Sequence, residues 1–308
     1  MEINAPALVP SGNRTSLPVI LAGLATTALA LFGVWAANQA SDSFNIMSWY
    51  GYYIIPIGAV LVGLVAGSGY GIASWVTGVR ISRTLLWVVV CLQVLAYFLA
   101  QYIDFRHLLS SNPEASQVGF LEFFDETTRS FAWTQKDGSA GSPLGAWGYL
   151  WRCLEIAGFG LGGLIVPLIL KAKPYCQSCQ RYMRTKALGL LPAGVPPMKI
   201  KKKDLDGKAE FDKAHESAWN QGMLSLEEMR KAGQEGKFER FNQILDEQRA
   251  AKKDIAKLTT RIAVSLSYCP SCHSSQMNAV SLSGQGNKIA RQELGISKVD
   301  PGLSRELV

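Results

Sequence analysis

Two pairs of cysteines, each with a two-residue spacer, are the residues of this sequence best suited to chemistry. They are Cys176 with Cys179 and Cys269 with Cys272. Such a spacer lets both sulfurs of a pair reach one ion from a tight turn, and two pairs complete a tetrahedral shell of four sulfurs. The spacing therefore predicts a metal clamp in which these four cysteines are the ligands.

The composition indicates what kind of chain carries this clamp. Its 308 residues are 48% hydrophobic and only 18% charged, which is unusually apolar for a soluble protein. Residues 171–308 hold 24 Lys and Arg against 15 Asp and Glu, whereas residues 1–170 hold 7 against 9. We therefore expect a membrane domain over residues 1–170 and a polar, basic domain over residues 171–308.

Four apolar stretches are long enough to cross a bilayer, which takes about 20 residues. They cover about residues 17–37, 49–78, 85–102 and 148–170. The second stretch exceeds what a bilayer needs, so it must tilt, protrude, or bend near Pro56 or the glycines from Gly67 to Gly71. The first is expected to be a retained anchor, because its apolar run is too long for a signal peptide.

The basic residues near the span ends predict the orientation, because Lys and Arg stay preferentially on the cytoplasmic side. They lie consistently on one side, at Arg14, Arg80, Arg83, Lys171 and Lys173. The loop over residues 38–48 has no Lys or Arg, and the loop at about 103–146 has three against six acidic residues. We expect an integral protein of a plasma or bacterial inner membrane, with both termini cytoplasmic.

The outer loop at about 103–146 is rich in aromatic residues. Helical spacing would put Phe120, Phe124 and Phe131 on one side of a short helix. The favoured interpretation is a helix on the membrane surface with its rings at headgroup level. The alternative is an extracytoplasmic lid or docking surface.

Small and polar residues within the spans predict how the helices pack. Glycines at four-residue spacing permit close approach of helix backbones, and they are Gly63, Gly67 and Gly71 in the second span and Gly158 and Gly162 in the fourth. Packing within one chain is favoured over homo-oligomerisation. Arg152 and Glu155, three residues apart, are expected to pair near the outer boundary, where Arg152 can reach water, rather than form an ion or proton site. Gln93 is expected to form an interhelical hydrogen bond.

The cytoplasmic placement favours metal over disulfides, because cytosolic thiols are kept reduced. A closed shell of four sulfurs in a non-redox domain is most often structural zinc, and iron is the alternative. A thiol oxidoreductase is less favoured, since its reactive cysteines would face the oxidising side. Cys91 and Cys153 are interpreted as buried small hydrophobic residues.

The cysteine segments resemble a zinc ribbon. Residues 261–268 read as a strand, Cys269-Pro-Ser-Cys272 as a turn, and residues 277–282 as the returning strand. Tyr175 precedes the first turn, and residues 182–191 follow it. The resemblance covers about fifty residues and implies a fold and a metal, with no reaction.

The chain departs from a compact ribbon because 89 residues lie between Cys179 and Cys269. A helical insertion at about 200–260 is expected to fill this gap. Its predicted helices are residues 204–220, a second opened by a capping box over residues 225–228, and a third over residues 237–258. Gly233 and Gly236 would separate the last two.

A basic run opens the insertion, with lysines at Lys199, Lys201, Lys202 and Lys203. Anionic lipid headgroups are the favoured partner, because a tethered run beside a membrane gains about 1 kcal/mol per Lys. Nucleic acid is less favoured, since no aromatic neighbours are present to stack bases. A solvated loop is an interpretation favoured at least as much as either of these.

These features predict a mainly α chain: a four-helix polytopic membrane domain, then a cytoplasmic zinc-ribbon-like β module interrupted by an α-helical insertion. The sequence contains no HExxH, P-loop, Gly-x-Ser-x-Gly or Rossmann fingerprint. The favoured function is therefore a non-catalytic membrane scaffold that docks a protein partner or itself. A transporter or channel subunit is the alternative, based on the intramembrane polar residues.

Overall fold

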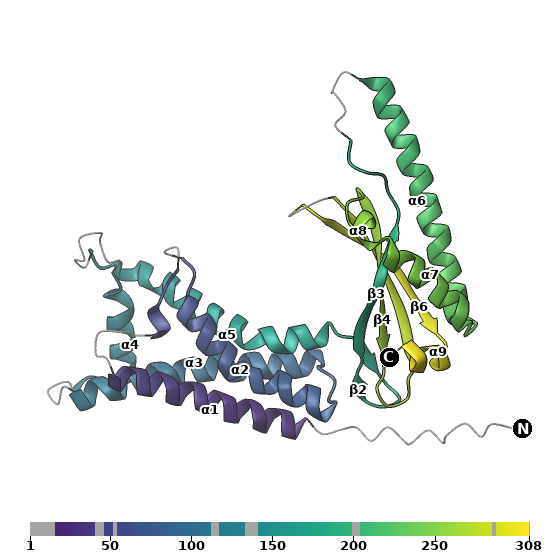
Figure 1. Ribbon diagram of the computed structural model, residues 1–308. Helices are drawn as coiled ribbons and strands as arrows, with labels where there is room; N and C mark the ends of the chain where they lie inside the picture. Colours follow the sequence, from purple (N-terminus) through teal and green to yellow (C-terminus); the bar gives the residue numbers. More distant parts are fainter. Residues whose placement is uncertain are drawn as a thin grey trace, which may run out of the picture. The chain divides into compact units, whose positions relative to one another are not determined.

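The computed structural model describes residues 16–40, 46–51, 54–111, 117–132, 141–198, 204–284 and 288–307. The described residues form two compact units, which divide between Lys173 and Pro174. The first unit is helical, and the second combines helices with two antiparallel sheets (Figure 1). The expectation of a mainly helical chain with four long apolar helices and a small β region is confirmed.

Four helices in the described part of the chain are long and apolar enough to cross a membrane. They are α1 (Leu17–Ala40), α2 (Ile57–Thr77), α3 (Arg83–Ser111) and α5 (Gly148–Lys171). Helix α2 packs against both α1 and α5, and it is the most buried of the four. Helix α2 is therefore the central helix of this unit.

The second span is shorter than the predicted stretch over residues 49–78. Helix α2 begins after Pro56, which has non-helical backbone angles, and ends at Gly78, whose φ is +73°. The residues before it form the 3₁₀ turn η1 (Ile46–Ser48) and an isolated bridge between Gly51 and Ile55. Proline and glycine thus limit α2 to 21 residues, the length that a bilayer requires.

The predicted outer loop is more structured than its composition indicated. Helix α3 continues to Ser111, and α4 (Phe120–Arg129) and the 3₁₀ turn η3 (Gly145–Trp147) follow. Because α4 ends at Arg129, the prediction that Phe131 shares its helical face is wrong.

The rings of α4 face the bundle. Phe123 is buried with its ring centroid 5.3 Å from that of Phe105, and the Phe120 ring lies 5.6 Å from Tyr102. These contacts pack α4 against α3.

The second unit begins with strands β1 (Tyr175–Cys176) and β2 (Arg181–Tyr182), which pair with each other. A four-stranded antiparallel sheet follows, in the order β3-β4-β5-β6. Its strands are β3 (Arg184–Pro192), β4 (Thr260–Tyr268), β5 (Ser275–Ser283) and β6 (Ala290–Val299). Alternate residues of β4 and β5 are buried, as expected for a sheet with one covered face.

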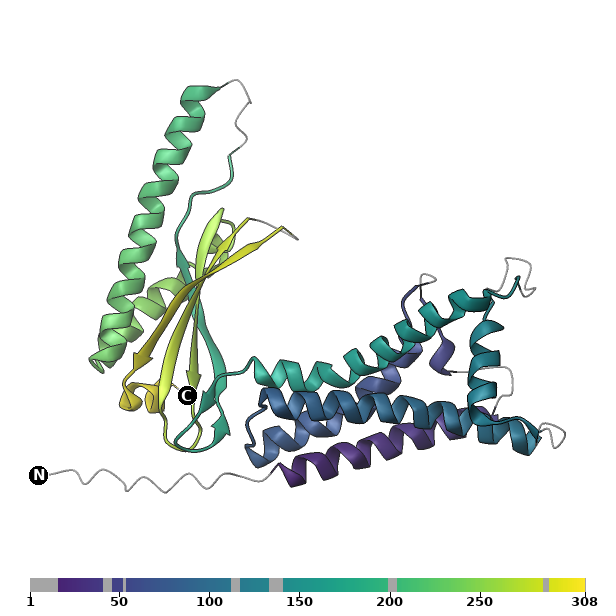
Figure 2. The same ribbon diagram turned by 180° about the vertical axis from the view of Figure 1, so that it is seen from behind.

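Helices between β3 and β4 cover that face (Figures 1 and 2). They are α6 (Leu205–Gln234), α7 (Phe238–Ala250) and the short α8 (Lys252–Ile255). A further helix, α9 (Pro301–Leu307), follows β6. The shared core contains Leu226 and Met229 of α6, Phe241 of α7, and Ile262 and Leu266 of β4. The predicted insertion is therefore the cover of the sheet.

The predicted capping box over residues 225–228 is wrong, because these residues lie inside one continuous helix, α6. Asp204 caps that helix, and its Oδ1 accepts a hydrogen bond of 2.9 Å from the Gly207 backbone amide. Buried positions continue at helical spacing on both sides of Ser225, at Gly222, Leu226, Met229, Ala232 and Gly233. Packing on the sheet therefore extends the helix through the local capping signature.

Candidate metal centre

The first cysteine turn connects β1 to β2. Cys176 pairs with Arg181 and Tyr175 with Tyr182, and the Met183 amide donates to the Pro174 carbonyl over 2.9 Å. The two tyrosine rings meet edge to face with centroids 5.1 Å apart. This short hairpin holds the Cys176 and Cys179 thiols on one turn.

The second cysteine turn connects β4 to β5. The Cys269 amide donates to the Ser274 carbonyl over 2.9 Å, and the His273 amide donates to the Cys269 carbonyl over 3.0 Å. Ser304 of α9 donates its hydroxyl to the His273 carbonyl over 2.7 Å. In both turns the residue that follows the second cysteine has a left-handed backbone. Its φ is +50° at Gln180 and +57° at His273.

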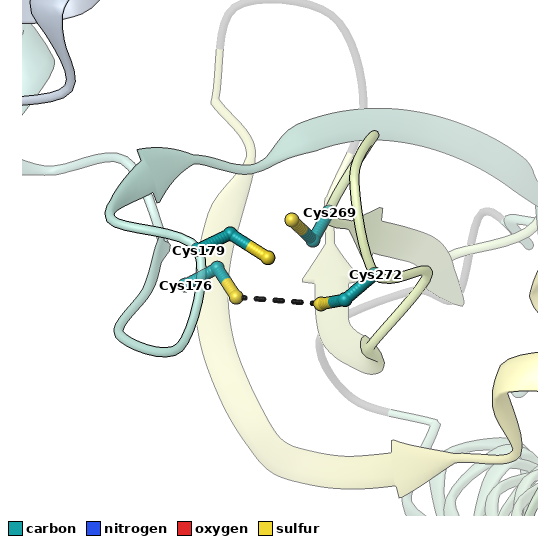
Figure 3. Close-up of side chains that lie close together, drawn as sticks. All are labelled: Cys176, Cys179, Cys269 and Cys272. Carbon is teal, nitrogen blue, oxygen red and sulfur yellow. Dashed lines mark hydrogen bonds between the residues drawn. The ribbon is translucent and has the colours of Figure 1, made fainter. Parts of the chain in front are cut away.

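The two turns meet at one end of the sheet, because β3 and β4 pair in a register that places Arg184 opposite Tyr268. The four sulfurs all lie within 4.8 Å of one another, and those of Cys176 and Cys272 are 3.6 Å apart (Figure 3). A tetrahedral ion with bonds of about 2.3 Å to sulfur needs sulfurs about 3.8 Å apart. The four cysteines could therefore hold one metal ion, as their spacing predicted.

The cysteines are free thiols, and the site is partly shielded from water. Cys269 and Cys176 are buried, and Cys179 and Cys272 are half-buried. A disulfide requires sulfurs about 2.05 Å apart, so the 3.6 Å separation of Cys176 and Cys272 is that of ligands in a shared shell.

The electrostatics of the thiol cluster favour a bound cation. Burial, followed by the neighbouring thiols of Cys272 and Cys269, raises the pKa of Cys179 to about 12, and burial also raises the pKa of Cys176. Burial acts to raise the pKa of Cys269 as well, but hydrogen bonds from the Cys272 and Ser271 amides outweigh it, so this pKa is lowered. The protonated form is thus favoured at Cys176 and Cys179, and a bound cation would oppose this by stabilising their thiolates.

The remaining cysteines lie elsewhere. Cys91 of α3 and Cys153 of α5 are exposed on the outside of the helical unit, so their predicted burial is wrong. Their helices present these side chains to the surroundings of the bundle, which would be lipid in a membrane.

A second group of polar residues gathers around Glu155 in the helical unit. Its carboxylate accepts hydrogen bonds from Tyr97 over 2.7 Å and Tyr50 over 2.9 Å, and from Ser48 over 3.2 Å. Arg152 adds an ion pair of 2.8 Å. Glu155 is 1% exposed, and these four donors satisfy its acceptor capacity.

Arg152 does not reach out to water, because it is only 9% exposed. Its guanidinium donates to the hydroxyls of Thr127 and Thr128, each over 3.2 Å, and lies over the Phe124 ring. The cluster thus joins α5 to α3, to α4 and to the turn before α2. This set of bonds favours a structural role for Arg152 and Glu155.

The glycines of α2 and α5 lie in the contact between these two helices. A Cβ at Gly63 would overlap the Phe159 carbonyl oxygen, and one at Gly67 would overlap the Gly163 backbone. The other three glycines face the opposite helix or its N-terminal proline: Gly71 meets Val166, Gly158 meets Pro56, and Gly162 meets Val60. The close approach is therefore made within one chain.

Gln93 differs from its expectation. It is fully buried against Gly163 of α5, yet neither its amide oxygen nor its amide nitrogen has a hydrogen-bond partner among the described residues.

The lysines of the basic run, Lys199, Lys201, Lys202 and Lys203, lie outside the described residues.

Sequence reasoning missed two contributors to the metal centre, Ser304 and the strand β6 that leads to it. The sequence of β6 is charged and does not alternate between apolar and polar residues. Because this composition is atypical of strands, it gave no clear signal for this element. No family model, no curated protein and no solved structure matches this chain.

Proposed function

We propose that this chain is an integral membrane scaffold whose polar unit is fixed by one structural zinc ion and docks another protein or a second copy of itself. The observation that carries this proposal is the meeting of four thiols from two turns 89 residues apart, with all sulfurs within 4.8 Å. A closed shell of four cysteines leaves no position for a substrate, which is typical of structural zinc.

The ion would act on the sheet rather than on a substrate. It would tie the β1–β2 turn to the β4–β5 turn and so join the two ends of the α6–α8 excursion. Zinc is preferred to iron because a closed cysteine shell with no redox partner is most often a zinc site. The ordered surface that results is the proposed docking module.

The membrane placement follows from sequence and helix length together. Four helices can cross a bilayer, and the basic residues beside them favour cytoplasmic N and C termini in a plasma or bacterial inner membrane. Free thiols with metal-binding geometry are suited to that reducing side. The basic run at residues 199–203 would contact anionic lipids there.

The metal can be tested with the full chain in detergent and a Cys269→Ser variant, with Cys91→Ser as the matched control. We expect about one zinc per chain in the wild type and the control, and loss of zinc together with faster hydrogen exchange in β4 and β5 in Cys269→Ser. Iron in place of zinc would give visible absorption from sulfur-to-iron charge transfer. A folded wild-type chain that binds neither metal would contradict the proposal.

Docking needs a separate measurement. Cross-linking in membranes followed by purification should recover the same specific neighbours with wild type and Cys91→Ser, and lose those bound to the polar unit with Cys269→Ser. An unchanged set of neighbours for all three proteins, with zinc lost only from Cys269→Ser, would contradict a docking role for the zinc-stabilised unit.

A further inference from the structure

Strand β6 forms one edge of the four-stranded sheet, and its first half is open to a further strand. All residues from Ala290 to Glu293 are exposed, although they pair with Val280–Ser283 of β5. In both ribbon views this end of the β5–β6 hairpin extends away from α6 (Figures 1 and 2). An edge strand presents unpaired backbone N–H and C=O groups to any strand that can align with it.

The middle of β6 is obstructed for a further strand. The Asn278/Val280 irregularity places a bulge near Gly295, whose φ is +99°. Arg230 of α6 donates to the Leu294 carbonyl over 2.8 Å and reaches the Gly295 carbonyl at 3.4 Å. A bulge and a bound arginine both hinder strand addition, so they separate the open edge at residues 290–293 from the rest of the strand.

The charges of this open edge are complementary to themselves. Arg291 and Glu293 lie two residues apart and so share one face of the strand. An antiparallel copy aligned with Gln292 opposite Gln292 would place each Arg291 opposite Glu293 of the second copy, twice across a two-fold axis. Alignment on Arg291 or on Glu293 would instead set like charges opposite each other, which is unfavourable.

Neither Arg291 nor Glu293 has an ion-pair partner among the described residues. We propose that residues 291–293 of β6 pair antiparallel with the same residues of a second copy of this chain, with Gln292 on the two-fold axis. The inference deepens the docking function proposed above, on which it rests, by naming the partner as a second copy. The interface is short, and anchoring of both copies in one membrane would raise their effective concentration.

Charge exchange tests the register. Arg291→Glu and Glu293→Arg should each convert two attractive pairs into two repulsive ones, and weaken association of the full chain in detergent by about tenfold or more. The double variant R291E/E293R restores both pairs in reversed order, so it should associate as the wild type does. Light scattering during size-exclusion chromatography over a range of concentrations measures the subunit number.

A cysteine placed on the axis tests the geometry. Gln292→Cys should give a disulfide-linked dimer under mild oxidation, whereas Lys298→Cys, an exposed position of the same strand, would lie about 40 Å from its counterpart and should not. A monomeric wild type, single variants that associate normally, or a double variant that stays dissociated would each overturn the proposal. Zinc content is measured on the same samples, so a zinc-loaded monomer would reject self-pairing alone, and a metal-free chain would reject the zinc-stabilised module.

Discussion

Arg184 pairs with Tyr268 across β3 and β4, and this cross-strand pair brings two distant cysteine turns together. Cys176 and Cys179 lie just before Arg184, and Cys269 directly follows Tyr268. Because the register of two long strands is set by many cross-strand contacts, the sheet itself contributes to the positions of the thiols. A metal ion bound there would tie together one end of the sheet, in contrast to a small finger that folds only around its ion.

Metal binding should release protons, and its affinity should increase with pH. Cys179, whose burial and thiol neighbours raise its pKa to about 12, and Cys176, whose pKa is also raised by burial, are protonated at neutral pH and must ionise to bind. Calorimetry of zinc binding in buffers of different ionisation enthalpy should show at least two protons released per ion at pH 7.

The sign of the pH effect follows from these pKa values. Lowering the pH from 7 to 5 keeps both thiols protonated and should weaken zinc binding by about ten-thousandfold, because two released protons change the affinity about a hundredfold per pH unit. An affinity for zinc that is independent of pH over this range would show that the thiols are already ionised, or that other groups bind the ion.

The strands beside the cysteines were predictable because their signal is local. Residues 261–268 form most of strand β4, as expected, with burial that alternates up to Leu266, and a turn of two cysteines follows. The four apolar helices were predictable for the same reason, since hydropathy over about 20 residues is enough to identify each one. Where one short window holds all the information, the sequence predicted the structure.

The remaining features depend on contacts between distant residues. Ser225 and Glu228 match a capping signature, yet the buried face of α6 overrides it. Strand β6 carries Arg291, Glu293 and Lys298 and pairs on one side only, so its sequence lacks the apolar alternation of a covered strand. Neither the donors of Glu155 nor the burial of Arg152 follows from spacing, because α3, α4 and the turn before α2 supply their partners.

Adding one methyl group between α2 and α5 should destabilise the helical unit. Gly67→Ala places a Cβ against the Gly163 backbone, which cannot move without separating the two helices. We expect a loss of about 1–3 kcal/mol, which is typical of overpacking. Gly160→Ala is the matched control, because a Cβ there has no neighbour within 4 Å.

Thermal unfolding in one detergent, monitored by the helical circular dichroism signal, measures the difference. The Gly67→Ala protein should unfold several degrees below wild type, and the Gly160→Ala protein should unfold at or slightly above it, since alanine is the better helix former. Equal unfolding temperatures for both variants would show that α2 and α5 are not in close contact.

Neutralising Glu155 should be far more destabilising than neutralising an exposed acid of a similar pair. Glu155→Gln leaves the buried guanidinium of Arg152 without its counter-ion, and loss of one partner of a buried pair costs about 3–5 kcal/mol. The control is Asp125→Asn, because Asp125 pairs with Arg129 over 2.8 Å with both side chains about half exposed. Exposed pairs of that kind contribute about 0–1 kcal/mol.

The location of the damage distinguishes this network from general loss of stability. Since Arg152 binds Thr127 and Thr128, Glu155→Gln should increase hydrogen exchange first in α4 and in the turn before α2, ahead of the glycine-packed centre of α2. The variant Arg152→Leu/Glu155→Leu removes both charges and should recover part of the lost stability, because no unpaired ion remains. A Glu155→Gln protein with wild-type exchange in α4 would mean that the ion pair does not hold this helix to the bundle.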